Sequence, residues 1–508
     1  MNEESSQLKI GATLNYINMA LGSLIPLLYT PVMLRILGQD EYGLYKLSGS
    51  ITGYLGLLSL GIGSAIIRNL IKARTEGGHD MEQKVFSLFV MIYRIIGLVT
   101  IVVGMILVFN IDRWYGESIQ PNQMVRMQTL VAIMVLHSSL SLMMGPYYSI
   151  IVAHERFVYA QSVGIIFTIL GPALNLVALF FGYASIGLAV TSLLTTLLSQ
   201  IIYRIYVMKS LQIHIMYRNL PWYLAKEILY FSFWIFLGEL TSLLYNSTDN
   251  LLIGSRAELG TNAVAIYSIG CVMTSMIFSF TTGISSVLAP RVNKMCFEGA
   301  SNSELTDFAI KVGRIQLLIV TLCISGFIAL GVPFLELYAG EGYSSAYYVT
   351  LLTVIPLVPS LVQNVFLNVS MARFQHQFRS IVYLLIAVVN VVGTYLVLPS
   401  LGIVGAALIT GIAGVIGRGF VMNWYYDKKM HLETTRFWKN LYKIFIMPAL
   451  LAAVGLALLH NVEFSLIGLF VAIVIYAFLL CILQFAFFMD EYEKGLITKM
   501  FSKVKIIK

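Results

Sequence analysis

Residues 464–488 read FSLIGLFVAIVIYAFLLCILQFAFF and carry no charged side chain. About 20 consecutive apolar residues are enough for a helix to cross the hydrocarbon core of a bilayer. Comparable stretches recur along the chain, and they are too long and too weakly alternating for membrane strands. We therefore expect an all-α integral membrane protein with fourteen spans, at 10–34, 44–70, 85–109, 124–150, 158–181, 184–207, 227–253, 262–288, 312–337, 346–370, 379–398, 401–425, 441–460 and 464–488.

The composition supports a polytopic membrane protein. Of the 508 residues, 33 are basic and 25 acidic, so charged residues make up 11%, whereas soluble domains carry about 25%. Fourteen spans of about 20 residues would use roughly 280 residues. The longest connections between them, at about 208–226 and 290–311, are too short for a catalytic domain. The four cysteines do not suggest a disulfide framework, and the polar first nine residues do not suggest a cleavable signal peptide.

The basic residues predict the orientation. With the N-terminus in the cytoplasm, 26 of the 33 lysines and arginines fall on the cytoplasmic side, five fall outside and two, Arg94 and Arg418, lie within spans. This asymmetry indicates that both termini are cytoplasmic. It also accounts for the net charge of +8 through contact with anionic lipid, so we expect no nucleic-acid partner.

The chain contains an apparent internal repeat, for which chance matches in apolar sequence are the alternative explanation. Six spans per unit give both units one orientation, which predicts two parallel six-helix repeats around a central cavity. The expected parts are an N-lobe (1–215), a C-lobe (216–430), and two further helices with a basic cytoplasmic tail (431–508). A shift of 222 residues pairs Leu37/Leu259, Gly38/Gly260, Tyr45/Tyr267, Thr52/Thr274, Gly61/Gly283, Ile62/Ile284, Ser64/Ser286 and Lys72/Lys294, and a shift of 218 pairs Ser162/Ser380, Gly187/Gly405 and Ala189/Ala407.

The span at 227–253 carries a polar stripe. On a continuous helix its five members would lie within a sector of about 100°. Such a stripe predicts either a cavity wall with two carboxylates or a buried structural network between helices. We expect one of the two carboxylates to bind a proton or sodium ion that biases transport. The stripe consists of Glu239, Ser242, Asn246, Asp249 and Asn250, and its carboxylates are Glu239 and Asp249.

Further candidates for a substrate cavity lie in the first three spans. Asn15, Asn18 and Tyr29 share one face of the first span, where helix packing is the alternative role. Arg35 and Lys46 flank the outer end and could bind anions, or could extend to the membrane interface. Arg94 lies deeper, in the third span.

Motifs for catalysis or metal binding are absent from the sequence. The seven histidines are scattered, and no glycine-rich loop precedes a Lys-Ser or Lys-Thr pair. We therefore expect no metal, no cofactor and no ATP hydrolysis, and we do not expect an enzyme.

Four motifs resemble a known family. They are LRILGQDEYGLY at residues 34–45, LGIGSAIIR at 60–68, DNLLIG at 249–254 and GIVGAA at 402–407. Together they resemble the polysaccharide-transport family of the multidrug/oligosaccharidyl-lipid/polysaccharide exporter superfamily, over about residues 10–430.

The resemblance implies a flippase for undecaprenyl-pyrophosphate-linked oligosaccharides that works by alternating access in the bacterial cytoplasmic membrane. Implied partners are the lipid-linked oligosaccharide, membrane lipids, a polysaccharide polymerase and glycosyltransferases. Lipid II flippases of the superfamily have a cationic cavity, but the first span here lacks an arginine in its middle. The cationic role therefore carries over to Arg35 and Lys46 only. Alternatives are a cation-coupled multidrug exporter, a multispan glycosyltransferase or polymerase, and a lipid scramblase or assembly scaffold.

Overall fold

The computed structural model describes residues 3–373, 375, 377–459 and 462–495. Asn246 and residues 280–290, among others, are described by their backbone only. The chain divides into two compact units, Met1–Ser268 (unit 1) and Ile269–Lys508 (unit 2). All regular elements in the described residues are helical, which confirms the predicted all-α fold.

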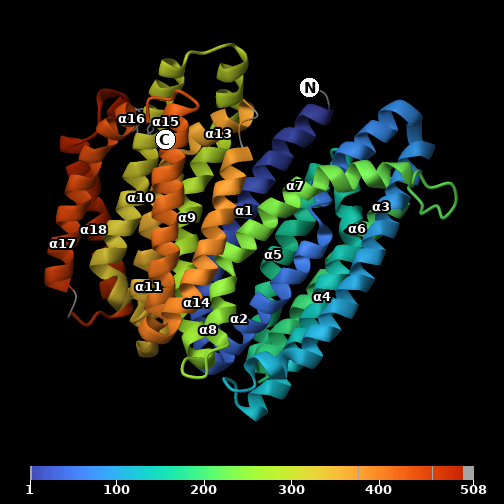
Figure 1. Ribbon diagram of the computed structural model, residues 1–508, viewed down its shortest axis with the longest axis horizontal. Helices are drawn as coiled ribbons and strands as arrows, with labels where there is room; N and C mark the ends of the chain where they lie inside the picture. The colour runs from blue at the N-terminus through green and yellow to red at the C-terminus, as the bar shows by residue number, and fades with distance from the viewer. Residues whose placement is uncertain (1–2, 374, 376, 460–461, 496–508) are drawn as a thin grey trace, which may run out of the picture. The chain divides into compact units, whose positions relative to one another are not determined.

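Unit 1 is built from long helices joined by short turns (Figure 1). Its elements are α1 (Glu3–Leu37), α2 (Gln39–Gly53), η1 (Tyr54–Ser59), α3 (Gly63–Tyr115), α4 (Pro121–Ala153), α5 (Phe157–Phe180), α6 (Ala184–Lys209), α7 (Tyr223–Asn246), α8 (Thr248–Gly254) and the first residues of α9 (Gly260–Phe297).

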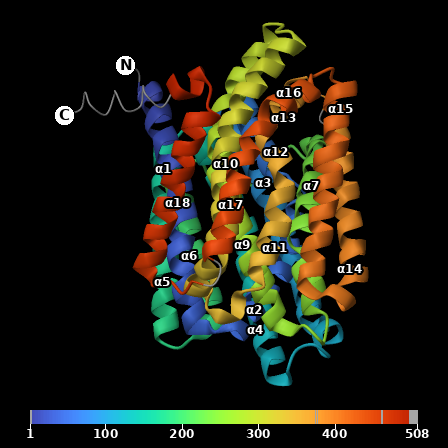
Figure 2. The ribbon, with the colours of Figure 1, turned by 90° about the vertical axis from the view of Figure 1, so that its left-hand side faces the viewer.

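Unit 2 contains the rest of α9 and two more groups of helices (Figure 2). The first group is α10 (Asn302–Ala339), η2 (Glu341–Tyr343), α11 (Ala346–Val354), η3 (Ile355–Leu357), α12 (Val358–Val362), α13 (Asn364–Ala372), α14 (Gln377–Gly414), η4 (Val415–Val421) and α15 (Met422–Lys428). The second is α16 (Thr434–Leu441), η5 (Tyr442–Phe445), α17 (Ile446–Leu459) and α18 (Leu466–Phe487).

Eleven helices in the described residues are long and apolar enough to cross a membrane. Two of these stretches, 65–115 and 377–428, exceed 50 residues, and each is interrupted by a glycine with positive φ, Gly78 and Gly402. The stretch 377–428 therefore covers two predicted spans, 379–398 and 401–425. The chain is a multi-pass membrane protein, and the count of fourteen spans stays a prediction.

Several predicted spans are not single helices, among them those at 44–70 and 346–370. In the span at 44–70, α2 ends at Gly53 and a 3-10 turn follows before α3 begins at Gly63. In the span at 346–370, Pro356 and Pro359 lie where α11 gives way to η3 and α12. Proline removes a backbone N–H and clashes with the preceding turn, which explains the second interruption.

The backbone conformation of three pairs of glycines adds support for the internal repeat. Gly38 and Gly260 both have positive φ, at 75° and 61°, and lie 222 residues apart. The pairs Gly78/Gly299 and Gly182/Gly402 also share positive φ and lie 221 and 220 residues apart. Three breaks at a nearly constant spacing are difficult to attribute to chance matches in apolar sequence.

The compact units do not coincide with the predicted lobes. The division falls after Ser268, inside α9, because α7 packs on α3 and η1, and α8 packs on α2. The lobe boundaries at 215 and 430 stay a prediction.

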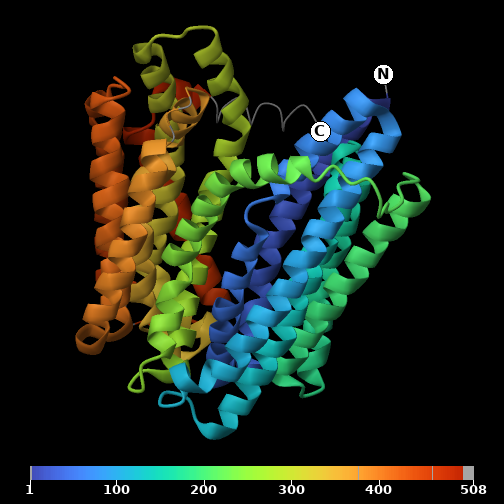
Figure 3. The same cartoon turned by 45° about the vertical axis from the view of Figure 1, so that its right-hand side comes forward.

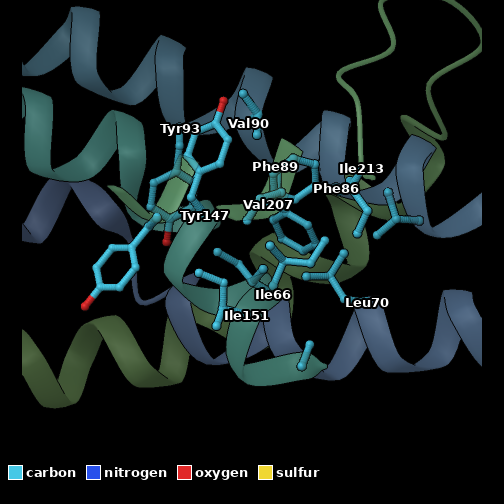
Figure 4. Packing of buried hydrophobic residues seen from close by; sticks show 14 of the residues in the cluster. Ile66, Leu70, Phe86, Phe89, Val90, Tyr93, Tyr147, Ile151, Val207 and Ile213 are labelled. Atoms are coloured by element: carbon cyan, nitrogen blue, oxygen red, sulfur yellow. The ribbon is translucent and has the colours of Figure 1, made fainter. Parts of the chain in front are cut away.

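One apolar cluster packs several helices of unit 1 together (Figure 4). It combines both parts of α3 with α4, α5 and α6, and it includes Ile66, Phe86, Tyr147 and Val207. Burial of a large apolar side chain contributes about 1.5–3 kcal/mol, so this cluster fixes the helices that carry the polar residues described below.

The last two helices pack on α10 within unit 2. Tyr476 and Leu480 of α18 join Leu330 in an apolar cluster, and Gln484 donates to the hydroxyl of Thr321 at 3.4 Å. These contacts attach the C-terminal helices firmly to the repeat that precedes them.

Candidate functional site

The predicted polar stripe does not lie on one helix. α7 ends at Asn246, Ser247 has φ −117° and ψ −22°, and α8 begins at Thr248. The assumption of a continuous helix from 227 to 253 was therefore wrong, because the backbone turns between the two carboxylates. Glu239 and Ser242 are exposed on α7, and the side chain of Asn246 lies outside the described set.

Asp249 has a different environment from Glu239. Its side chain is 1% exposed and accepts a hydrogen bond from the hydroxyl of Tyr267. Beside it, Tyr54 and Thr248 are hydrogen-bonded hydroxyl to hydroxyl at 2.5 Å. A buried carboxylate needs such donors to offset its lost hydration. The structural-network interpretation therefore fits Asp249, and the cavity-wall interpretation stays a prediction for the exposed Glu239 and Ser242.

Asn250 links α8 to its neighbours. Its amide nitrogen donates to Ser50 of α2 at 3.2 Å, and its amide oxygen accepts from Ser268 at 3.4 Å. Both contacts lie between helices, which is typical of polar side chains that hold membrane helices together.

The candidates on α1 are directed mainly toward α5. Asn18 donates to Gln161 at 3.3 Å and accepts from Thr168 at 2.9 Å. Tyr29 is hydrogen-bonded to Asn175. Of Asn15, Asn18 and Tyr29, only Asn15 is exposed.

Arg35 lies in the first family motif, and Lys46 directly follows it. Arg35 is exposed in the last turn of α1, and Lys46 is half-buried with its Nζ 5.4 Å from the ring centroid of Tyr42. Both positions leave a cationic group near the surface of unit 1.

The first family motif itself forms a structural junction. Glu41 makes an ion pair with Arg126 of α4 at 2.7 Å and accepts a hydrogen bond from Ser185 of α6. Asp40 accepts from Thr261 at 2.9 Å. These acidic residues tie α2 to three helices, a role that their position in the sequence did not reveal.

Arg94 is surrounded by tyrosines. Its Nη1 donates to the hydroxyl of Tyr217 at 3.4 Å, and it is also hydrogen-bonded to Tyr147. Figure 4 shows the rings of Tyr93 and Tyr147 together at the edge of the apolar cluster. Arg94 is half-buried there.

The acidic residues upstream of Arg94 are engaged elsewhere. Glu82 is 1% exposed and lies 2.9 Å from His154 and 3.8 Å from Arg74. Asp80 pairs with Lys84. The Glu82–His154 pair was not predicted. A signal for it exists in the sequence, because the 222-residue shift places a glutamate, Glu304, and a histidine, His376, at the equivalent positions.

A separate cavity of about 660 Å³ opens between the end of α9 and the start of α10. Arg291 lies over the ring of Phe308 at 5.0 Å on its wall, and Lys311 also lines it. None of the predicted site residues lines this cavity.

Across the described part of the chain, no group of three His, Cys, Asp or Glu residues could hold a metal ion.

Comparison with known families decides the affiliation. A family described as "Polysaccharide biosynthesis protein" matches residues 11–296, which is 286 of 508 residues. The chain belongs to this family. The predicted resemblance is thus confirmed.

One similar curated protein is the "Uncharacterized membrane protein EpsK" of Bacillus subtilis (strain 168). It is 23% identical to this polysaccharide biosynthesis family member over 376 residues, which is 72% of this chain and 71% of the relative.

Two solved structures share the fold of this family member. The inward closed conformation of the lipid II flippase MurJ superposes with a TM-score of 0.73 at 14% identity, covering 94% of this chain and 98% of that one. An inward-facing multidrug resistance MATE transporter of the MOP superfamily gives 0.58 at 15% identity, covering 85% and 100%. At this level of identity the likeness shows the fold alone.

Proposed function

We propose that this protein flips an undecaprenyl-pyrophosphate-linked oligosaccharide from the cytoplasmic to the outer leaflet by alternating access. The family match and the flippase-like fold support this proposal. The protein would act without an enzymatic step, in a bacterial cytoplasmic membrane with both termini in the cytoplasm. Glycosyltransferases would act before it, and a polysaccharide polymerase would act after it.

The observation that carries the proposal is the exposed polar surface of α7. Glu239 and Ser242 are exposed on a short apolar helical segment, Ile235–Tyr245. A charged side chain at the bilayer centre costs at least about 2.5 kcal/mol, so a surface of this kind needs water or a polar substrate. Passage of a hydrated sugar–diphosphate headgroup would supply both.

Glu239 is the better candidate for ion coupling. It is exposed, whereas Asp249 is buried and hydrogen-bonded to Tyr267. A coupling carboxylate must exchange its proton or sodium ion with water during the cycle. We therefore assign this role to Glu239, and expect Asp249 to stabilise the α7–α8 turn.

Among the remaining candidates, the exposed ones would contact the headgroup. Asn15, Arg35 and the half-buried Lys46 offer an amide and two cations to sugar hydroxyls and diphosphate. Asn18 and Tyr29 would act indirectly, because their polar groups bind α5.

The leaflet distribution of lipid-linked oligosaccharides tests the function. In a strain lacking the gene, we expect a complete repeat unit to accumulate on the cytoplasmic side and the surface polymer to disappear. Complementation with the wild-type gene should restore both. Normal lipid-linked pools with an intact surface would contradict the proposal.

The second candidate function is multidrug export, which the MATE-like fold favours. Drug sensitivity of the same deletion strain separates the two functions. Hypersensitivity to several unrelated cationic drugs with normal surface polymer would support export of drugs. Incomplete repeat units on the lipid would instead indicate a glycosyltransferase or polymerase.

A further inference from the structure

The cavity between the end of α9 and the start of α10 brings two cations together within unit 2. Its volume of about 660 Å³ is in the usual range of small-molecule sites. Arg291 of α9 and Lys311 of α10 both line it, and both are exposed. Figure 3 shows the turn that joins these two helices in yellow-green. The cavity therefore presents a guanidinium group and an ammonium group from two different helices.

Each of the two cations lies over an aromatic ring. The guanidinium carbon of Arg291 is 5.0 Å from the ring centroid of Phe308, and Nζ of Lys311 is 5.9 Å from that of Tyr492. Such contacts position a cation but leave its N–H groups able to donate to a ligand. Among the side chains that the structure describes, neither cation makes an ion pair with a carboxylate.

The three carboxylates that line the cavity have partners of their own. Glu298 and Asp307 each pair with a cation that does not line the cavity, at 3.6 and 2.5 Å. Glu304 accepts hydrogen bonds from the backbone N–H and the hydroxyl of Ser301, at 2.8 and 2.9 Å. The two cations on the wall are therefore the groups that the cavity offers to an anionic ligand.

The repeat indicates that the shared fold does not need these two cations. Under the 222-residue shift, Lys311 corresponds to Phe89, which is 0% exposed within the apolar cluster of Figure 4. Arg291 corresponds to Asn69, which donates to a backbone carbonyl one turn earlier in its own helix at 2.8 Å. The first repeat thus has a neutral residue at both positions. A ligand that binds only the second repeat would explain the difference.

We propose that Arg291 and Lys311 bind a phosphate group, supplied either by the headgroup of an anionic lipid or by a soluble phosphate compound. A planar guanidinium group can engage two phosphate oxygens at once, and an ammonium group adds a second positive charge. The predicted topology places this connection on the cytoplasmic side, where basic pockets between membrane helices bind lipid headgroups. The bound phosphate would bridge α9 and α10.

This inference goes beyond the proposed transport function and does not depend on it. None of the residues assigned to transport lines the cavity. Every readout of the test below is a binding affinity or a melting temperature. The leaflet assay of the deletion strain therefore tests the flippase function alone.

Ligand binding to the purified full-length protein tests the site. Native mass spectrometry measures the lipid probes, which are phosphatidylglycerol and phosphatidylcholine, whose choline neutralises its phosphate. Isothermal titration calorimetry measures ADP as the soluble probe. We expect the wild type to bind phosphatidylglycerol more tightly than phosphatidylcholine, or to bind ADP. The affinity should fall as salt rises, because the site is exposed.

Single substitutions locate the binding. We expect Arg291→Gln and Lys311→Gln each to weaken binding of phosphatidylglycerol or of ADP by about three- to tenfold. Lys439→Gln is the matched control, because Lys439 is an exposed lysine of unit 2 that does not line the cavity. It should leave both affinities unchanged. An equal loss in the control would refute the site in favour of general surface charge.

A carboxylate variant separates ligand binding from a structural role. Glu298→Gln removes a negative charge from the wall and releases Lys294. It should strengthen binding of the same probe by about two- to fivefold. A damaged fold would weaken binding instead, so a loss or an unchanged affinity here would contradict the proposal even if other variants fail to fold.

The double variant with Arg291→Gln and Lys311→Gln decides between the two sources. Loss of the preference for phosphatidylglycerol identifies a lipid headgroup as the ligand, and loss of ADP binding identifies a soluble phosphate compound. If the double variant melts like the wild type and binds both probes with wild-type affinity, the site is refuted. A wild-type protein that shows neither ADP binding nor a preference for phosphatidylglycerol refutes it as well.

Discussion

Replacement of Gly61 by alanine should destabilise unit 1, because an added methyl group there is strained and meets a neighbouring helix. Gly61 has a φ of 68°, which costs an alanine about 1–2 kcal/mol. A Cβ there would lie 2.7 Å from the Cβ of Ile235 and 3.0 Å from the backbone nitrogen of Phe236 on α7. Overpacking of this kind typically costs about 1–3 kcal/mol. Together the two effects predict a loss of about 2–5 kcal/mol.

The matched control is Gly56→Ala in the same connection. A Cβ on Gly56 meets nothing within 4 Å, and the residue lies in the η1 helical turn. Alanine there should change the unfolding free energy by no more than about 0.5–1 kcal/mol, and in the stabilising direction.

Equilibrium unfolding in mixed detergent–SDS micelles, followed by the fluorescence of the five tryptophans, gives both values. If Gly61→Ala and Gly56→Ala unfold at the same SDS fraction, the close approach of α7 to the connection before α3 is refuted. A loss in the predicted range would show that this family motif, LGIGS, is needed for backbone geometry.

Three further predictions concern polar contacts. Glu41→Gln should lower the unfolding free energy by about 1–3 kcal/mol, because Arg126 keeps only a neutral acceptor; an unchanged value at low salt would contradict the junction. Asn390→Ala should cost about 1–3 kcal/mol, because the buried hydroxyl of Thr410 loses its acceptor at 2.9 Å, and Thr410→Val should give most of the same loss. Hydrogen bonds from the backbone and hydroxyl of Ser301 lower the pKa of Glu304, so its contribution is present above pH 4.5 and is lost as pH falls below that value. Glu304→Gln should flatten this acid dependence of unfolding, and an unchanged slope between pH 5 and 3 would refute it.

The membrane fold could be predicted from the sequence because hydropathy acts over whole helices. A run such as residues 464–488 has no charged side chain, and α18 fills nearly all of it. Helix interruptions were harder to predict. Pro356 and Pro359 gave a signal, but a single turn at Ser247 has no signature in composition.

The sequence could identify the polar candidates of the site, but it could not tell which of them are buried. Glu239 and Asp249 look equivalent in the sequence, yet one is exposed and the other is buried against Tyr267. Periodicity gives the face of a helix but not what covers that face. Likewise, Tyr217 follows Arg94 by 123 residues, and only the folded connection brings the two together.

The internal repeat separates residues that the fold needs from residues that function could use. In the first repeat Thr191 donates to Asn175, and in the second Thr410 donates to Asn390. An asparagine–threonine bridge thus joins helical segments in each repeat, as polar side chains commonly do in membrane proteins. By contrast, Glu239 corresponds to Ile17 under the 222-residue shift.

A charge kept in one repeat and replaced by an apolar residue in the other cannot be required by the packing common to both. This reasoning selects Glu239, whose equivalent is Ile17, from the longer set of polar candidates. It also predicts that the neutral variant of Glu239 folds. The unfolding free energy of Glu239→Gln should lie within about 0.5 kcal/mol of the wild-type value, because surface substitutions usually change it by no more than that. Transport by this variant should lose its dependence on pH or sodium. Wild-type ion dependence in a folded Glu239→Gln protein would remove this carboxylate from the mechanism.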